Sequence, residues 1–243
     1  MPLALRGTVY RFAGGSPDLY GALVLTNDVW NRRMATVGVA PVRATASADS
    51  LWEPVFSREP DLQARVGFLA AQPKERLLES RFVLAPDQLA RVGSALADLL
   101  ASPDLTATPP SPPKSVPGPA DYPRWAEVYC AGPPIAGQVK RYVVVSRDQW
   151  NGATASAVAV RTTSQPKAWG VAFPAIEGGA ARACCGDATA IPGRRFDLTN
   201  RPFPPSLDLE DMARVARGLA DVFDLERTVD RGRGRRQAAA GAP

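Results

Sequence analysis

The chain has 243 residues, of which 45% are hydrophobic, enough for one large core or two ordinary ones. It contains no histidine and only three cysteines, Cys130, Cys184 and Cys185. Nucleophiles activated by histidine are therefore excluded, and neither a metal site nor a cofactor is expected. No segment resembles a signal peptide and no apolar run could span a bilayer, so we expect a cytoplasmic protein, off the membrane, with reduced cysteines.

The net charge of +5 is concentrated at one end of the sequence. The tail 231–243 holds four arginines and no acidic residue, whereas the remainder is close to neutral. Bulk charge is therefore weak support for binding of nucleic acid by the body of the protein. The tail itself, rich in Gly, Arg and Ala, has no apolar period and is expected to be disordered.

The sequence repeats itself with an offset of about 120 residues. The most specific shared motif is Asp-x-Trp-Asn, which occurs at Asp28–Asn31 and again at Asp148–Asn151. Strand-like segments around this motif match as well: Gly7–Tyr10 with Ala126–Tyr129, Ala22–Thr26 with Tyr142–Ser146, and Ala35–Val42 with Ala155–Thr162. We interpret the chain as a tandem duplication of one domain.

Each half ends in a predicted amphipathic helix. The first begins at Pro86, a residue suited to the first helical turn, and the second follows Asp208, a good N-cap. Apolar residues recur at helical spacing in both: Leu89, Val92, Leu96 and Leu99 in the first, and Met212, Val215, Leu219 and Val222 in the second.

These boundaries predict a first domain at 1–100, a linker at 101–121, a second domain at 122–230 and the tail at 231–243. Eight prolines between residues 101 and 123 favour extended polyproline II and make the linker a semi-rigid spacer.

Several short strands precede the helix in the first half, which indicates a mainly β fold with α. The predicted strands are Arg6–Phe12, Ala22–Thr26, Ala35–Val42, Glu53–Phe56 and Val66–Ala71. Strands of this number and length predict a small curled sheet or an SH3-like barrel, with the C-terminal helix packed against it.

The order of the motifs resembles the MazF/PemK family of toxins from bacterial toxin–antitoxin systems. The resembling segments are Gly7–Tyr10, Leu23–Asp28 followed by Asn31, Thr36–Ala40, and Gln72-x-Lys74 with Arg81-Phe82. The resemblance covers nearly all of the first half and most of the second. It implies two SH3-like barrels that form a fused pseudo-dimer, an endoribonuclease activity on single-stranded RNA without metal, and an antitoxin protein as a partner.

The family chemistry implies an arginine that opens the second strand and a threonine or serine that closes the third. A guanidinium stabilises the charge that builds when a 2′-hydroxyl attacks the adjacent phosphate, and a hydroxyl holds a phosphate oxygen. In the second half these positions fall on Lys140, with Arg141 beside it, and on Thr163, with Thr162 beside it. The resemblance therefore implies a catalytic set of Lys140, Arg141 and Thr163.

In the first half the same two positions fall on Tyr20, followed by Gly21, and on Arg43. Both are altered, so we expect the second half to carry the catalytic site. The late glutamine of the family matches Gln72 here and, in the second half, Asp187.

Other residues are candidates for binding RNA without catalysing its cleavage: Arg43, Thr162, Trp150, Arg233 and Arg235. Arginines bind phosphates, and a tryptophan ring can stack on a base. The alternative for Trp150, and for its counterpart Trp30, is packing of a loop on the barrel. The aspartates before these tryptophans, Asp28 and Asp148, are expected to cap a turn.

Two classes of function stay open at this point. One is a toxin-like endoribonuclease whose second half is catalytic. The other is an inactive MazF-like module that binds RNA or a protein, which the altered positions favour. A third, poisoning of DNA gyrase, has no residue in this sequence that points to it.

Overall fold

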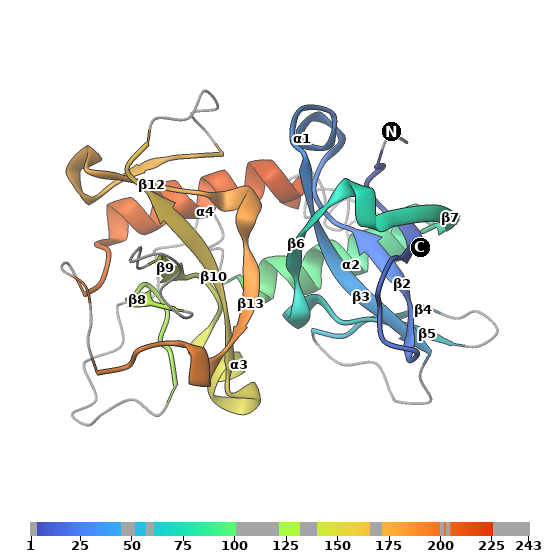
Figure 1. Cartoon of the computed structure of the whole chain (residues 1–243), viewed down its shortest axis with the longest axis horizontal. Coiled ribbons are helices and arrows are strands. Elements are labelled where there is room, and N and C mark those ends of the chain that lie inside the picture. Colours follow the sequence, from blue (N-terminus) through green and yellow to red (C-terminus); the bar gives the residue numbers. More distant parts are fainter. Residues whose placement is uncertain are drawn as a thin grey trace, which may run out of the picture. The chain divides into compact units, whose positions relative to one another are not determined.

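The computed structural model describes residues 4–44, 52–56, 61–100, 122–131, 140–165, 172–199, 202 and 205–225. They form two compact units, the first made of Met1–Asp98 with Ala220–Pro243 and the second of Leu99–Leu219. Each unit contains one set of antiparallel strands, so the chain is mainly β with some helices (Figure 1). The predicted linker 101–121 and tail 231–243 lie outside the described residues.

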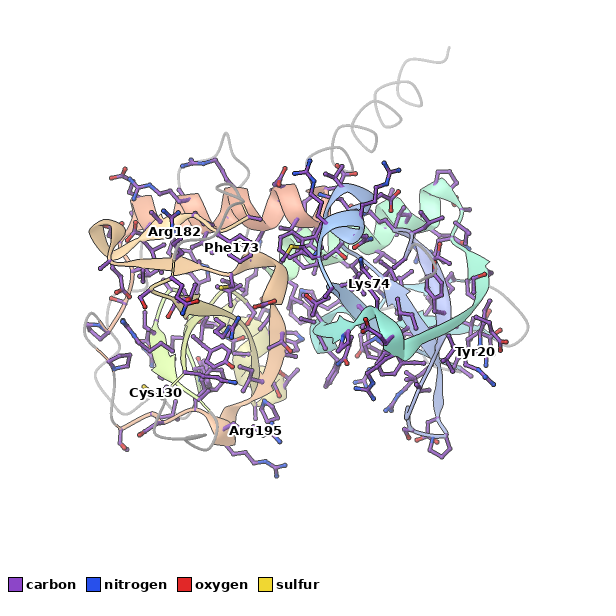
Figure 2. The ribbon with its side chains drawn as sticks, turned by 45° about the horizontal axis from the view of Figure 1, so that its top comes forward. Tyr20, Lys74, Cys130, Phe173, Arg182 and Arg195 are labelled. Atoms are coloured by element: carbon purple, nitrogen blue, oxygen red, sulfur yellow. The ribbon has the colours of Figure 1, made fainter. Side chains whose placement is uncertain are left out.

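The sheet of unit 1 has the strand order β4-β5-β3-β2-β1-β7, and β6 also pairs with β3. Its strands are β1 (Thr8–Phe12), β2 (Leu19–Val24), β3 (Thr36–Ala44), β4 (Val55–Phe56), β5 (Leu62–Ala64), β6 (Ala70–Pro73) and β7 (Leu77–Val83). The helices are α1 (Asp28–Arg33), α2 (Pro86–Leu99) and two 3-10 turns, η1 (Val66–Phe68) and η2 (Lys74–Arg76). Tyr20 and Lys74 mark β2 and η2 among the side chains of this unit (Figure 2).

Unit 2 repeats this plan with the strand order β11-β12-β10-β9-β8, and β13 also pairs with β10. Its strands are β8 (Val128–Cys130), β9 (Arg141–Val144), β10 (Ser156–Thr163), β11 (Ala175–Ile176), β12 (Ala181–Ala183) and β13 (Thr189–Pro192). Its helical elements are α3 (Asp148–Thr154), α4 (Leu209–Phe223), η3 (Glu177–Gly179), η4 (Cys185–Asp187) and η5 (Gly193–Arg195).

The strand prediction for the first half is wrong in three places. The predicted strand Val66–Ala71 begins as the turn η1, and β6 starts only at Ala70. The short strand β5 was not predicted. Strand β7 was not predicted either, because four successive residues, Leu78–Arg81, are exposed and show no alternation of apolar and polar side chains. No pairing joins β4 to β7 among the described strands, so closure of the sheet into a barrel stays a prediction.

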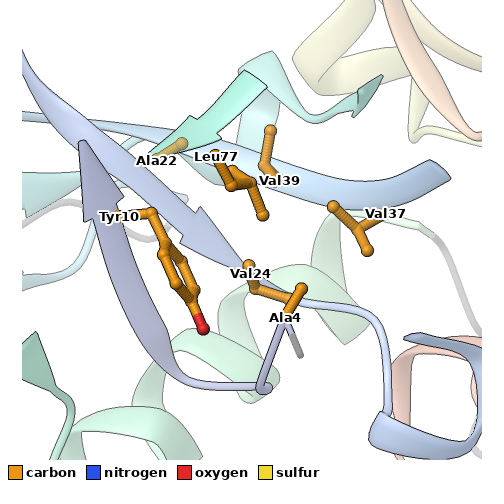
Figure 3. Close-up of a cluster of buried hydrophobic side chains, with 7 residues drawn as sticks. All are labelled: Ala4, Tyr10, Ala22, Val24, Val37, Val39 and Leu77. Carbon is orange, nitrogen blue, oxygen red and sulfur yellow. The ribbon is translucent and has the colours of Figure 1, made fainter. Parts of the chain in front are cut away.

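The strands bury small and β-branched side chains on one face of each sheet. In unit 1 a cluster from β1, β2 and β3 is closed by Leu77 (Figure 3), and it consists of Ala4, Tyr10, Ala22, Val24, Val37, Val39 and Leu77. The corresponding cluster of unit 2 consists of Tyr129, Val144, Ala157, Ala159, Ile191 and Phe196. Valine and alanine suit these positions because they fill a pleated face without losing much rotamer freedom.

The Asp-x-Trp-Asn motif places a buried asparagine in each unit. Asn31 Oδ1 accepts from Thr26 Oγ1 at 2.6 Å, and its amide donates to Thr26 O at 2.8 Å. Asn151 makes the same two contacts with Ser146. The Thr26 hydroxyl also accepts from Gly38 N of β3, and the Ser146 hydroxyl accepts from Val158 N of β10. A buried amide needs hydrogen-bond partners, and both asparagines have them. The matching motifs of the two halves therefore make matching contacts in the two units.

The aspartates of the motif do not act as predicted. The N-cap of α1 is Asn27, whose side chain accepts from Trp30 N at 2.7 Å. Asp28 Oδ1 instead accepts from Arg6 N at 2.8 Å, and Asp148 Oδ1 accepts from Trp125 N at 2.6 Å. Each carboxylate therefore ties a short helix to the segment before the first strand. Burial raises the pKa of Asp148, against the opposing effect of the Trp125 N–H.

The last turn of α4 packs into unit 1. Phe223 is fully buried there, and Val222 O accepts from Asn27 N at 2.8 Å. Asp224 forms an ion pair with Arg6 at 2.8 Å. Arg147 of unit 2 corresponds to Asn27 of unit 1, and its backbone N–H donates to Leu99 O, near the end of α2, at 3.0 Å. The unit limits thus differ from the predicted domain limits at the ends of both long helices.

Candidate functional site

The end of the β9–β10 pair brings together residues that are separate in the sequence. Arg161 of β10 lies opposite Tyr142 of β9, so that Thr162 follows next to Arg141. The Thr162 hydroxyl is 3.5 Å from Arg141 O. Antiparallel pairing has therefore placed a hydroxyl beside the residue that carries the guanidinium.

Arg141 forms an ion pair with Glu177, a residue that the sequence did not single out. Arg141 Nη2 lies 2.7 Å from Glu177 Oε1, and Nη1 lies 3.4 Å from Oε2. The side chains are 29% and 9% exposed, so the pair is open to solvent mainly on the arginine side. Because both terminal nitrogens of Arg141 contact the carboxylate, the orientation of the guanidinium is fixed.

The backbone around Glu177 is held in an uncommon conformation. Glu177 has φ +55°, in the left-handed region, and Gly178 and Gly179 continue it at +63° and +92°. Glu177 N donates to Asp211 Oδ2 at 2.6 Å, and Asp211 also accepts from Arg214 Nη1 at 2.7 Å. The buried Asp211 at the start of α4 thus fixes the turn that presents the Glu177 carboxylate.

A carboxylate, a guanidinium and a hydroxyl at one strand end are suited to acid–base work on a phosphate ester. The carboxylate can accept a proton from an attacking hydroxyl. The guanidinium can stabilise the negative charge that develops on the phosphate, and the threonine hydroxyl can donate to a phosphate oxygen. Among the described residues, no group of three histidine, cysteine or acidic side chains could hold a metal ion.

The other two predicted catalytic residues lie next to this group. Lys140 is exposed and directly precedes β9, with its carbonyl accepting from Ala131 N at 3.2 Å. Thr163 ends β10 opposite Arg182, and its hydroxyl accepts from Gln165 N at 3.2 Å. The structure therefore gathers Lys140, Arg141, Thr162 and Thr163 at one end of two paired strands.

Unit 1 lacks the same chemistry at the matching strand end. Gly21 of β2 lies opposite Val42 of β3, where unit 2 has Arg141 and Thr162. Arg43 follows, half-buried, and its Nε is buried with no hydrogen-bond partner among the described residues. Cζ of the Arg81 guanidinium lies over the Tyr20 ring, 4.4 Å from the ring centroid.

Two of the sequence-based assignments need correction. Trp150 is 3% exposed, so its ring offers no face to a base and is not an RNA contact. Gln72 lies opposite Val37, whereas the residue opposite the matching Ala157 is Ile191, not Asp187. Asp187 ends the turn η4 and pairs with Arg161 at 3.0 Å. Arg233 and Arg235 lie outside the described residues.

Cys130, labelled in Figure 2, is the residue of β8 that lies opposite Arg141 of β9. It is half-exposed, whereas Cys184 and Cys185 are buried. Burial raises the pKa of the Cys130 thiol, the nearby charge of Arg141 opposes this, and Asp197 adds to it. The reactivity of Cys130 therefore reports on the charge at the site.

Replacing Arg141 by methionine should slow alkylation of Cys130 at a fixed, mildly alkaline pH. Loss of the positive charge raises the thiol pKa further, so the thiolate that reacts forms only at higher pH. Alkylation followed by mass spectrometry across a pH series measures the shift. Arg141→Lys, which keeps the charge, is the control. An unchanged profile in Arg141→Met would show that Arg141 does not influence this thiol.

No protein-family model matches the chain, and no curated protein matches it. Among solved structures, an endoribonuclease from Mycobacterial species has 22% identity and a TM-score of 0.35, over 40% of this chain and 90% of that chain. An endoribonuclease in complex with its cognate antitoxin, also from Mycobacterial species, has 23% identity and a TM-score of 0.34, over 39% and 91%. A MazE-MazF structure from Deinococcus radiodurans has 19% identity and a TM-score of 0.31, over 41% and 92%.

The chain is similar to MazF toxins. Each match covers about 40% of this chain. Within the described residues, no helix is long and apolar enough to cross a membrane.

Proposed function

We propose that the chain is a toxin-like endoribonuclease that cleaves single-stranded RNA without a metal ion, at the end of β9 and β10 in unit 2. The observation that carries the proposal is the Arg141–Glu177 pair beside the Thr162 hydroxyl. Attack of a 2′-hydroxyl on the adjacent phosphate needs a group that accepts a proton and a cation that stabilises the pentavalent phosphate. Both are present within one ion pair.

Each residue has a distinct role in this reaction. Glu177 accepts the proton of the 2′-hydroxyl, and Arg141 turns its guanidinium from the carboxylate towards the phosphate as negative charge builds there. Thr162 and Thr163 donate to phosphate oxygens, and the exposed Lys140 binds a neighbouring phosphate. The bond from phosphorus to the 5′-oxygen breaks and the 5′-oxygen takes a proton from solvent water, which gives a 2′,3′-cyclic phosphate and a 5′-hydroxyl end; Glu177 returns its proton to solvent.

Arginines outside this site extend the RNA contact by charge. Arg43 of unit 1 and Arg233 and Arg235 of the tail bind phosphates and do not act in the chemical step. Their contribution falls as salt rises, because binding releases counterions from the RNA.

The same proposal covers assembly and partner. The chain is a fused pseudo-dimer of two related domains, one that retained the catalytic residues and one that lost them, and it works in the cytoplasm. An antitoxin protein is its inhibitor. Joining two domains in one chain raises their effective concentration and lets each diverge.

Incubation of the purified protein with a long single-stranded RNA in EDTA tests the activity. Discrete cuts with 5′-hydroxyl ends are expected, mapped by ligation of the new ends before and after phosphorylation. RNA that stays intact at a high excess of protein would contradict the proposal.

A second candidate function is a non-catalytic module that binds RNA or a protein. Both terminal nitrogens of Arg141 contact the Glu177 carboxylate. This favours a role of the ion pair in stabilising the fold over a role in cleaving RNA. A filter-binding measurement with the same RNA separates the two functions. Tight, salt-dependent binding without new ends would support the module.

A further inference from the structure

Two separate contacts hold Glu177, one on its side chain and one on its backbone. Its carboxylate forms the ion pair with Arg141, and its backbone N–H donates to Asp211 Oδ2 at 2.6 Å. The Arg141 side chain is 29% exposed and that of Glu177 only 9%. A phosphate that arrives from solvent therefore meets the guanidinium before the carboxylate.

The carboxylate of Asp211 is fixed from within its own helix. Asp211 is 5% exposed and lies in the first turn of α4. Its backbone N–H donates to Asp208 Oδ1 at 2.8 Å, and its Oδ1 accepts from Arg214 Nη1 at 2.7 Å. One oxygen of the carboxylate is thus bound along the helix, and the other extends to the turn that contains Glu177.

The backbone of Glu177 depends on this support. Its φ of +55° lies in the left-handed region, which a residue with a Cβ adopts only when its surroundings impose it. Gly178 and Gly179, which follow at +63° and +92°, adopt such angles without strain. Loss of the contact with Asp211 would let Glu177 relax to a negative φ and turn its carboxylate away from Arg141.

The matching helix of unit 1 packs on its sheet without such a carboxylate. Alignment of the apolar positions of α2 and α4 places Gln88 where α4 has Asp211. Gln88 Oε1 accepts from Ala85 N at 3.1 Å, just before its own helix. A contact between α2 and β4 is made by Arg91 Nη1, which donates to Val55 O at 3.0 Å. Docking of the helix therefore does not require a carboxylate at this position, which points to a role of Asp211 in the site of unit 2.

We propose that Asp211 is a positioning residue of the cleavage site, which keeps the Glu177 carboxylate in place while Arg141 leaves it for the substrate phosphate. The inference rests on the proposed function, in which Glu177 is the base. Because the Glu177 backbone is tied to Asp211, opening of the ion pair moves the arginine, and the carboxylate stays where the 2′-hydroxyl needs a proton acceptor. Asp211 does not touch the RNA and acts through Glu177.

Single-turnover cleavage of a short RNA by the full-length protein tests this role. Asp211→Ala should slow cleavage by roughly tenfold to a hundredfold and change the half-saturating RNA concentration little, since Asp211 does not contact the substrate. Asp211→Asn, whose amide oxygen can still accept from the Glu177 N–H, should recover most of the rate. Glu210→Ala is the matched control and should keep the wild-type rate. Glu210 lies in the same turn and also pairs with Arg214, but its side chain is 75% exposed.

A double variant shows whether Asp211 acts through Glu177. In the Glu177→Ala chain the base is already absent, so adding Asp211→Ala should slow cleavage by less than about twofold. Hydrogen exchange of the Glu177 amide, followed by NMR, gives a readout that does not depend on cleavage. Protection of this amide should fall in Asp211→Ala and persist in Asp211→Asn and Glu210→Ala. Circular dichroism verifies that each variant is folded.

An active wild type whose rate Asp211→Ala leaves unchanged would overturn this inference and leave the proposed function intact. Equal losses from Asp211→Ala in the wild-type and Glu177→Ala chains would also overturn it, because Asp211 would then act independently of Glu177. A wild type that leaves RNA intact would contradict the proposed function and the role of Asp211 with it, even where the Glu177 amide loses protection in Asp211→Ala.

Discussion

Arg141→Ala and Glu177→Ala should each lower the rate of RNA cleavage by roughly 10²–10³-fold. Arg141 supplies the charge that opposes the developing negative phosphate, and Glu177 supplies the base. Because the two act as one pair, the double variant should lose little more than either single variant. Single-turnover cleavage of a short RNA, with protein in excess, measures these rates apart from product release.

Variants of unit 1 serve as controls for this experiment. Tyr20 and Arg43 lie at the strand ends of unit 1 that match the site of unit 2. Tyr20→Ala and Arg43→Ala should keep most of the activity, because neither residue belongs to the Arg141–Glu177 pair. Arg141→Lys should retain part of it, because lysine keeps the charge but not the planar fork. Equal losses from both units would contradict a single site in unit 2.

A smaller loss is expected from the hydroxyls. Thr162→Val removes a donor while keeping the shape of the side chain, and Thr163→Ala removes the neighbouring hydroxyl. Thr162→Ser, which restores the donor, should recover the rate lost in Thr162→Val. If the serine variant is as slow as the valine variant, the hydroxyl is not what matters at this position.

Phe223→Ala should lower the free energy of unfolding of unit 1 by about 3–5 kcal/mol, although residue 223 is far from that unit in the sequence. Its ring is fully buried, and a Cβ added at Gly38 would meet Phe223 Cε1 at 2.8 Å. Truncation leaves a cavity against β3 that the rigid strand cannot fill. Hydrogen exchange of peptides from β3 measures the loss of protection.

Two comparisons make this prediction specific. Arg217→Ala, at an exposed position of the same helix, should change stability by less than about 0.5 kcal/mol. Gly38→Ala should destabilise the wild type but be tolerated better beside Phe223→Ala, which removes the clashing ring. Additive effects of the two changes would contradict direct packing of Phe223 on Gly38.

The two long helices and most strands of the first half could be predicted from the amino-acid sequence. These features follow from local causes: the Asp-x-Trp-Asn motif, helical spacing of apolar residues, and alternation along half-buried strands. Four residues that the resemblance implies for the site, Lys140, Arg141, Thr162 and Thr163, lie at one end of β9 and β10. Strand β7 could not be predicted in this way, because its residues Leu78–Arg81 are exposed in succession and lack the alternation that marks a strand.

The carboxylate that pairs with Arg141 could not be predicted from the sequence. Glu177 lies 36 residues further along the chain, on a turn fixed by Asp211 of α4, and no local pattern encodes that contact. The same holds for the burial of Trp150 and for the packing of Phe223 into unit 1. Helical spacing and strand alternation depend on residues close together in the sequence. These contacts depend instead on how distant segments pack against each other in the folded chain.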